Sequence, residues 1–306
     1  MIQTGLIGCG SWGKNYLKTL KNIEGFQLAW VYNKNNKIIL PKGIQFTKDY
    51  LQILKDPKTN AVIISTPPKT HYEIAKIALE NEKDVLVEKP MTLSSKKALK
   101  LMEIAKKKSK ILMVGNIFLY NPGIIYLKES IEKGEFGELS YFNSRRLGSD
   151  LPDRGISLMW NLASHDISII NHLSGKLPLE VLANSSQESI SLNLQYEDGL
   201  RAEIKVDGTK SKKIRNLLTV GKEKFSTFED TLEEDKLKIF DLEKMTAHFP
   251  PLEKTSPLEK QCLHFLDCIE KRKDPLTNGK NGYEGVKILE AAQKSLKKDG
   301  KVKIIL

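Results

Sequence analysis

Apolar residues in the first third of the chain follow two alternating patterns. Short continuous apolar runs are typical of buried strands, whereas apolar residues recurring every three or four positions are typical of amphipathic helices. The strand-like runs are residues 4–7, 26–32, 61–64, 85–87 and 111–114, and the helix-like segments are residues 12–23, 50–54, 71–81 and 94–108. This alternation predicts an α/β fold with a doubly wound parallel sheet, covered by helices on both faces.

The pattern changes after about residue 120. Helical periodicity at 122–133 and 157–173 flanks a strand-like run at 139–146. Six further strand-like runs follow, at residues 179–185, 189–196, 200–206, 217–220, 225–228 and 236–242. The turn pairs Asp198–Gly199 and Asp207–Gly208 are typical of hairpins. Two helical segments, 257–271 and 282–298, and a short strand at 302–305 complete the sequence.

We therefore predict two domains. The first comprises residues 1–120, and the second, residues 121–306, is an α/β domain with a large, open, mostly antiparallel sheet. Whether the final helix and strand pack back toward the first domain is left open.

The composition narrows the class of protein. With 306 residues, 40 % of them hydrophobic and 28 % charged, the chain is neither a small disulfide scaffold nor wholly disordered. The net charge of +11 raises the possibility of nucleic-acid binding, but the 49 basic residues are 43 lysines and six arginines. Lysines coat solvated surfaces, whereas arginine is suited to phosphate and base contacts. We expect no nucleic-acid partner, and keep a non-catalytic nucleotide-binding protein as an alternative.

The cysteines and the N-terminus indicate the compartment. Cys9, Cys262 and Cys268 are odd in number and lack metal-ligand spacing, which predicts reduced thiols and no metal. The sequence enters a strand-like run at once, without the regions of a signal peptide, and contains no apolar stretch of membrane-spanning length. We expect a cytoplasmic protein without a membrane partner.

A glycine-rich loop follows the first strand. Its pattern, G-x-G-x-x-G, permits a tight turn, close approach of the backbone to a pyrophosphate, and close packing of helix on strand, while the helix N-terminus supplies free N–H groups. In this strand–turn–helix context the loop predicts dinucleotide binding. The residues expected to contact the cofactor here are Gly8, Gly10, Ser11, Trp12 and Gly13.

The dinucleotide fingerprint also expects an acidic residue about 20 positions after the loop, on the adenosine ribose. This chain has Asn33 there, followed by Lys34. Asn33 can hydrogen-bond a ribose hydroxyl without repelling a 2′-phosphate, and Lys34 can attract one. NAD is the expected cofactor, with NADP left open, and a plain turn with a solvated lysine is the alternative.

Two blocks carry a resemblance to a known family. Residues 65–71, Ser-Thr-Pro-Pro-Lys-Thr-His, and residues 85–90, Val-Leu-Val-Glu-Lys-Pro, resemble the Gfo/Idh/MocA family of nicotinamide-dependent oxidoreductases. The resemblance implies an N-terminal Rossmann domain and a C-terminal domain whose open sheet makes the interface of a homo-oligomer, a dimer or tetramer. It also implies cofactor contacts at Ser65, Thr66, Pro67, His71, Glu88, Lys89 and Pro90.

Within that family, three later blocks resemble the UDP-N-acetylglucosamine 3-dehydrogenases and related nucleotide-sugar dehydrogenases. They are residues 118–122, 141–146 and 160–166. This likeness implies oxidation of a ring hydroxyl, at C3, of a nucleotide-activated sugar used in cell-surface polysaccharide or lipid A sugar biosynthesis. A reductase, or a dehydrogenase of another sugar, inositol or carbonyl compound, is the alternative.

Oxidation of a secondary alcohol requires a base for the hydroxyl proton and a group that stabilises the developing alkoxide. The resemblance assigns Lys89 to the substrate hydroxyl, where its cation would stabilise alkoxide character. His165 is the candidate base, because its ordinary pKa lies near neutrality. The family has an Asp four residues before this histidine, whereas this chain has Asn161, which cannot accept a proton. The candidate substrate-binding residues are Asn161, Tyr120, Asn121 and Arg146.

Overall fold

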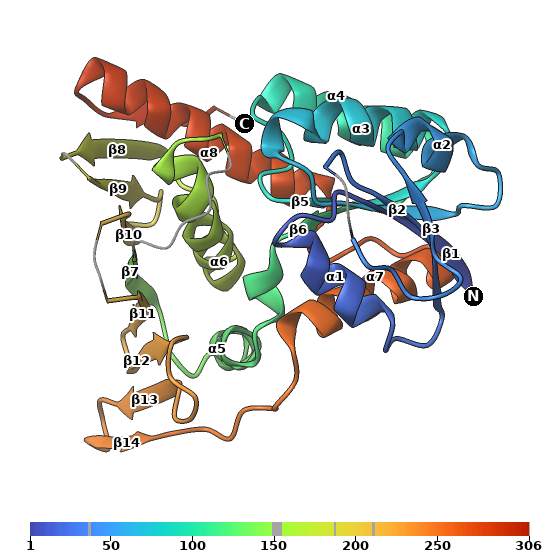
Figure 1. The fold of residues 1–306 in the computed structure, drawn as a ribbon. Coiled ribbons are helices and arrows are strands. Elements are labelled where there is room, and N and C mark those ends of the chain that lie inside the picture. The colour runs from blue at the N-terminus through green and yellow to red at the C-terminus, as the bar shows by residue number, and fades with distance from the viewer. Residues whose placement is uncertain (36–37, 149–154, 187, 210–211, 306) are drawn as a thin grey trace. The chain divides into compact units, whose positions relative to one another are not determined.

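The computed structural model describes residues 1–35, 38–148, 155–186, 188–209 and 212–305 (Figure 1). They form two compact units. The first unit is Met1–Ile117 with Thr255–Val286, and the second is Phe118–Lys254 with Lys287–Leu306. Among the described residues, no helix combines the length and the apolar character needed to cross a membrane.

The first unit contains a six-stranded sheet in the order β3-β2-β1-β4-β5-β6, with every neighbouring pair parallel. This is the strand order of a doubly wound dinucleotide-binding fold, which confirms the predicted parallel sheet. The strands are β1 (Ile2–Ile7), β2 (Phe26–Tyr32), β3 (Gln45–Thr47), β4 (Ala61–Ile64), β5 (Asp84–Glu88) and β6 (Leu112–Gly115).

Helices cover both faces of this sheet (Figure 1). The helices α2 (Tyr50–Lys55), α3 (Pro68–Glu80) and α4 (Ser95–Lys108) lie on one face, where their apolar residues pack on β4 and β5. On the other face lie α1 (Gly13–Leu20) and α7 (Pro257–Lys271). Because both faces are covered, all four residues of β4 and all five of β5 are buried.

Residues 255–286 belong to the first unit, although the pattern of elements had grouped them with the second domain. Three long-range contacts hold them there. Phe265 of α7 stacks on Phe26 with 6.3 Å between ring centroids, Gln261 Nε2 donates to Tyr16 Oη at 2.8 Å, and the Val114 N–H donates to the Thr277 carbonyl at 2.7 Å. Local periodicity carries no information about such partners.

The second unit contains a nine-stranded sheet in the order β14-β13-β12-β11-β7-β10-β9-β8-β15. Among the strands of the described residues, only β7 and β10 pair in parallel, so the sheet is mostly antiparallel, as predicted. The strands are β7 (Leu139–Leu147), β8 (Glu180–Ser185), β9 (Ser189–Gln195), β10 (Arg201–Asp207), β11 (Ile214–Gly221), β12 (Lys224–Glu229), β13 (Leu237–Asp241), β14 (Thr246–His248) and β15 (Val302–Lys303).

Helices lie on one face of the second sheet (Figure 1). They include α5 (Pro122–Glu132) and α6 (Ser164–Ser174), and a five-residue π-helical turn, η2 (Met159–Ala163), leads directly into α6. A 3₁₀ turn, η1 (Ile117–Tyr120), precedes α5, and α8 (Gly279–Lys298) begins in the first unit and ends in the second.

Alternation along β7 decides which of its side chains meet these helices. Phe142, Ser144 and Arg146 are buried on the helix-covered face, whereas Tyr141 is half-buried and Arg145 exposed on the opposite face. In the pairing of β7 with β11, Arg146 lies opposite Arg215. The inner face therefore carries two adjacent arginines beside the helices.

Candidate active site

The carboxyl ends of four parallel strands converge at one edge of the first sheet. β1 ends just before the glycine loop, β4 at Ile64 just before Ser65, β5 at Glu88 and β6 at Gly115, and the strands pair in the order β1, β4, β5, β6. Ligands of doubly wound sheets bind at this edge. The fold thus brings together three predicted segments, 8–13, 65–67 and 88–90, that are far apart in sequence.

The three glycines of the loop have different surroundings. Gly8 has φ +100°, and a Cβ on it would lie 2.7 Å from the Thr66 nitrogen. A Cβ on Gly13 would overlap the Gly8 carbonyl oxygen, whereas a Cβ on Gly10 would meet no atom within 4 Å. The first and third glycines therefore permit close packing, and the second faces open space. This cradle fits the pyrophosphate of a dinucleotide.

Two further contacts shape the loop. Ser65 Oγ donates to the Gly8 carbonyl at 2.5 Å, and the Gly8 N–H donates to the Tyr32 carbonyl at 3.0 Å. Among the residues described, no side-chain hydrogen bond caps the start of α1, because the N-cap residue Trp12 has only an N–H donor, which it directs to Glu88. The helix N-terminus is thus available to an anionic group.

Glu88 is a buried carboxylate that ties the loop to β5. Its Oε1 accepts from Trp12 Nε1 at 2.5 Å and from Tyr16 Oη at 2.8 Å, and Tyr16 Oη accepts in turn from Gln261 Nε2. Burial first, and then the charge of Glu88, raise the pKa of Tyr16 well above its ordinary value. Burial and Glu88 also raise the pKa of the Cys262 thiol. Tyr16 and Cys262 are thus kept neutral beside the carboxylate.

The sequence pattern did not identify Tyr16 or Gln261 as part of the site. Both are polar groups on otherwise apolar helix faces, so periodicity assigns them to the core. The only available signal was that a buried tyrosine hydroxyl needs a hydrogen-bond partner.

His71 links the two loops that follow β4 and β5. Its Nδ1 lies 2.9 Å from the Pro90 carbonyl oxygen, and its Nε2 lies 2.8 Å from the Thr66 carbonyl oxygen. A neutral imidazole has one N–H and can donate to only one of these carbonyls, so the tautomer decides which of the two contacts is a hydrogen bond. The ring is buried between the loops, and a direct contact of His71 with the cofactor stays a prediction.

Lys89 and Pro90 are buried directly after β5, and they are joined by a cis peptide bond. The Lys89 side chain is 4 % exposed, and its backbone N–H donates to Glu88 Oε2 at 3.2 Å. A lysine this buried differs from the solvated lysines that make up most of the chain's positive charge. Its position at the carboxyl edge of the sheet is the one that the sequence predicted.

Asn33 follows β2, next to the end of β1. Its Nδ2 donates to the Asn35 carbonyl at 2.7 Å, which makes it part of a turn, and Lys34 beside it is exposed. Contact of either residue with a ribose or a phosphate stays a prediction.

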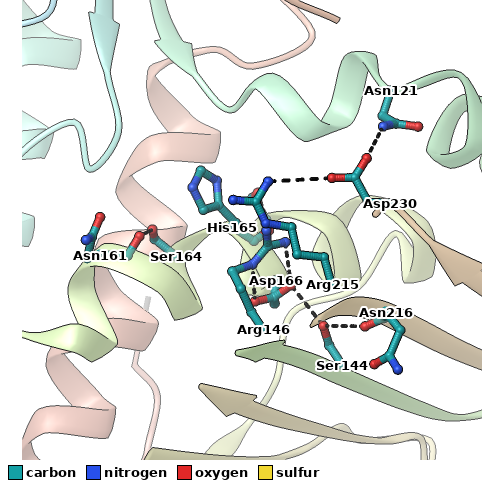
Figure 2. Close-up of polar contacts among 11 residues, drawn as sticks. Asn121, Ser144, Arg146, Asn161, Ser164, His165, Asp166, Arg215, Asn216 and Asp230 are labelled. Atoms are coloured by element: carbon teal, nitrogen blue, oxygen red, sulfur yellow. Dashed lines mark hydrogen bonds and ion pairs between the residues drawn. The ribbon is translucent and has the colours of Figure 1, made fainter. Parts of the chain in front are cut away.

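The candidate residues of the second unit form a polar cluster on the inner face of its sheet (Figure 2). Arg146 donates through Nε to Asp166 Oδ2 at 3.0 Å and through Nη2 to Asp166 Oδ1 at 2.9 Å, and Ser144 Oγ donates to Oδ1 at 2.8 Å. The Phe118 ring lies 4.4 Å from the Arg146 guanidinium carbon. Since Asp166 occupies this edge of the guanidinium, a substrate phosphate would have to compete with it for Arg146.

His165 adjoins this cluster. Its ring meets the Phe118 ring edge to face, with 4.8 Å between centroids. Asn161 lies on the π-helical turn one turn earlier, where its carbonyl oxygen accepts a 3.4 Å hydrogen bond from Ser164 Oγ. Asp166 points to β7 instead, as expected for neighbouring helical residues.

Asn121 and Tyr120 are both buried near the start of α5. Asn121 caps that helix, because its Oδ1 accepts from the Gly123 N–H at 2.9 Å, and its Nδ2 donates to Asp230 Oδ1 at 3.0 Å. Asp230 in turn faces Arg215, with 3.7 Å between Asp230 Oδ2 and Arg215 Nη1. No local pattern marks Asp230 or Arg215, which reach this cluster through the pairing of β11 and β12.

Family comparisons agree with both units. Residues 2–116 match the family model described as "Oxidoreductase family, NAD-binding Rossmann fold", and residues 128–304 match its "C-terminal alpha/beta domain". The chain belongs to the Gfo/Idh/MocA oxidoreductase family, and it is an enzyme of the oxidoreductase class.

Several characterised proteins are similar to it. A UDP-N-acetylglucosamine 3-dehydrogenase of Acidithiobacillus ferrooxidans is 28 % identical over 185 residues, 60 % of this chain and 57 % of that protein. A solved structure of that enzyme has TM-score 0.85 at 20 % identity, covering 97 % of this chain and 98 % of the other. A scyllo-inositol 2-dehydrogenase (NAD(+)) of Bacillus subtilis is 24 % identical over 304 residues, 90 % of this chain and 88 % of that protein.

Proposed function

We propose that this protein is an NAD(P)-dependent dehydrogenase that oxidises a ring hydroxyl, at C3, of a nucleotide-activated sugar such as UDP-N-acetylglucosamine. The observation that carries the proposal is Lys89, which is buried directly after β5 at the carboxyl edge of the first sheet. The glycine loop follows β1 at the same edge. The similarity to a UDP-N-acetylglucosamine 3-dehydrogenase supports the substrate class. A role in cell-surface polysaccharide or lipid A sugar biosynthesis belongs to the same proposal.

The residues of the glycine loop would hold the dinucleotide, and Asn33 would reach its adenosine ribose. The bound nicotinamide supplies a hydride acceptor. Lys89, with its positive charge held in a buried site, stabilises negative charge on the substrate oxygen as its proton leaves. In this proposal, Asn33 and Lys34 determine whether the enzyme prefers NAD or NADP.

In this scheme His165 accepts the hydroxyl proton. Asn161 has no basic group, so it orients the substrate through its amide, and the proton has no carboxylate acceptor at that position. The carbon that bore the hydroxyl becomes a ketone carbon as the proton leaves its oxygen for His165 and the hydride leaves the carbon for the nicotinamide.

The first test replaces the two proposed catalytic residues. We expect Lys89→Ala and His165→Ala each to lower kcat by about 10²- to 10⁴-fold, because each removes a group that acts on the hydroxyl proton or the developing charge. Absorbance of the reduced nicotinamide measures turnover of UDP-N-acetylglucosamine, and fluorescence titration measures cofactor binding, which His165→Ala should leave unchanged.

Matched controls are Lys96→Ala on α4 and His248→Ala on β14, both exposed positions. Their rates should equal that of the unaltered enzyme. Near-normal turnover by both the Lys89 and the His165 variants would overturn the proposal.

A second candidate is a dehydrogenase or reductase of a free sugar, an inositol or another carbonyl compound. Asn161 at the position of the family aspartate favours it, as does the similarity to an inositol dehydrogenase over most of the chain. A panel of alcohols and carbonyl compounds assayed in both directions decides between the two. Activity confined to compounds without a nucleotide would favour this second candidate.

A further inference from the structure

The inner face of the second sheet contains two arginines in direct cross-strand register. Arg146 on β7 lies opposite Arg215 on β11. Like charges placed opposite each other repel, so each cation needs a counter-charge. Asp166 supplies one for Arg146 and Asp230 supplies one for Arg215, and the two pairs differ sharply in geometry (Figure 2).

Arg146 is held in a close, buried ion pair. Its side chain is 7 % exposed, two of its N–H groups donate to Asp166, and its face packs on Phe118. A bidentate pair of this kind orients both partners and leaves Asp166 with little capacity for other donors, since Ser144 also donates to it.

Arg215 is engaged far less. Its side chain is 33 % exposed, and its ion pair with Asp230 joins atoms 3.7 Å apart, longer than a hydrogen bond. One oxygen of Asp230 already accepts from Asn121. Of the five N–H donors of the Arg215 guanidinium, most therefore have no acceptor among the residues that the structure describes.

The surroundings of Arg215 favour the arrival of an anion. Burial first, and then the cation of Arg146, lower the pKa of Arg215, although Asp230 and Asp166 act in the opposite sense. Figure 2 shows its guanidinium on the His165 side of the cluster. The Phe118 ring contacts both His165 and Arg146, so these two residues lie in the same part of the cluster.

We propose that Arg215 binds an anionic oxygen group of the substrate, a phosphoryl or a carboxylate group, and so selects nucleotide-activated or acidic sugars over neutral sugars and inositols. The inference rests on the proposed function, because it assumes that a sugar derivative binds at this cluster. Asp230, held by Asn121, orients the guanidinium, and Arg146 remains a structural cation bound to Asp166.

Calorimetric titration tests the inference, with saturating NAD present so that the glycine loop is filled. The ligands are UDP-N-acetylglucosamine, inorganic pyrophosphate, glucuronate and neutral N-acetylglucosamine. We expect Arg215→Gln to weaken the binding of anionic ligands about 10- to 100-fold, the range for loss of a charge-assisted hydrogen bond, without affecting the neutral sugar. Arg215→Lys, which keeps the charge but not the planar fork, should lie between.

Arg145→Gln is the matched control, since Arg145 is exposed on the opposite face of β7, and its affinities should stay within twofold of the unaltered protein. A loss confined to UDP-N-acetylglucosamine and pyrophosphate identifies a phosphoryl group as the ligand, and a loss confined to glucuronate identifies a carboxylate. Unchanged affinities in both Arg215 variants, or no anion binding by the unaltered protein, would overturn the inference. If pyrophosphate binding depends on Arg215 but UDP-N-acetylglucosamine is not turned over, the inference stands and the proposed function fails.

Discussion

At the scale of single residues, His172 in the last turn of α6 is a base whose surroundings oppose protonation. Burial first, and then the charge of Lys128 on α5, lower its pKa from 6.5 to about 4, although Glu132 acts in the opposite sense. A helix C-terminus ordinarily favours a protonated histidine, so burial and Lys128 outweigh the helix dipole here.

This shift predicts a loss of stability in acid. The unfolded chain takes up a proton near pH 6.5, and the folded chain resists it until about pH 4, so the free energy of unfolding falls as the pH drops through that window. We expect His172→Gln to remove about 2 kcal/mol of the fall between pH 7 and pH 4.5. Urea unfolding at the two pH values measures it.

His248→Gln is the control, because His248 is exposed on β14 and should leave the pH dependence as it is. The same pH dependence in the His172 variant and the unaltered protein would show that the charge of His172 does not couple to folding.

At the scale of an element, two glycines of the glycine loop are required for different reasons, one for packing and one for binding. Gly13 packs against the Gly8 carbonyl and Ser65, whereas Gly10 faces open space. The loop thus contains two glycines whose replacement by alanine tests different properties.

Gly13→Ala should destabilise the first unit, because its methyl group would overlap backbone that cannot move away without disturbing β1 and β4. Gly10→Ala should change the free energy of unfolding by less than about 1 kcal/mol, yet weaken dinucleotide binding at least tenfold, because the methyl group fills the space for the pyrophosphate. Urea unfolding and fluorescence titration with reduced nicotinamide dinucleotide measure the two effects. Full dinucleotide affinity in Gly10→Ala would place the pyrophosphate elsewhere.

At the scale of the whole molecule, the face of the second sheet opposite its helices is relevant to how copies of the chain associate. Leu218 and Val220 on β11 are half-buried on this face, and Phe225 of β12 stacks on Phe240 of β13 with 4.9 Å between centroids. We propose that two copies of the chain associate through this face, which gives these side chains an apolar partner. A cytoplasmic location and the lack of a nucleic-acid partner stay predictions at this scale.

Leu218→Asp should shift the protein from a dimer or tetramer toward a monomer, because it places a charge in the proposed interface. Sedimentation velocity at micromolar concentration measures the species present. Leu263→Asp, at an exposed position on α7 of the first unit, is the control and should leave assembly unchanged. A monomeric unaltered protein would end this proposal.

Much of the fold could be predicted from the sequence, because its strands and helices have clear periodicity. Strands buried on both faces are continuous apolar runs, so the parallel sheet was visible before its order was known. The short strand β3 was not predicted, because its three residues are polar or exposed in part. The assignment of residues 255–286 to the first unit depends on α7 packing against α1, which local periodicity does not specify.

The candidate site also combines features that the sequence specifies with features that only the fold specifies. The sequence alone determined the glycine loop, the Glu88–Lys89–Pro90 block and the family, because each is a run of neighbouring residues with its own geometric requirement. Only the tertiary structure decided that Tyr16 and Gln261 support Glu88, that Asp166 engages Arg146, and that Arg215 is the less occupied arginine. These facts are pairings across 15 or more residues, and the energy of a buried polar group depends on the partner that the fold brings to it, which no local pattern specifies.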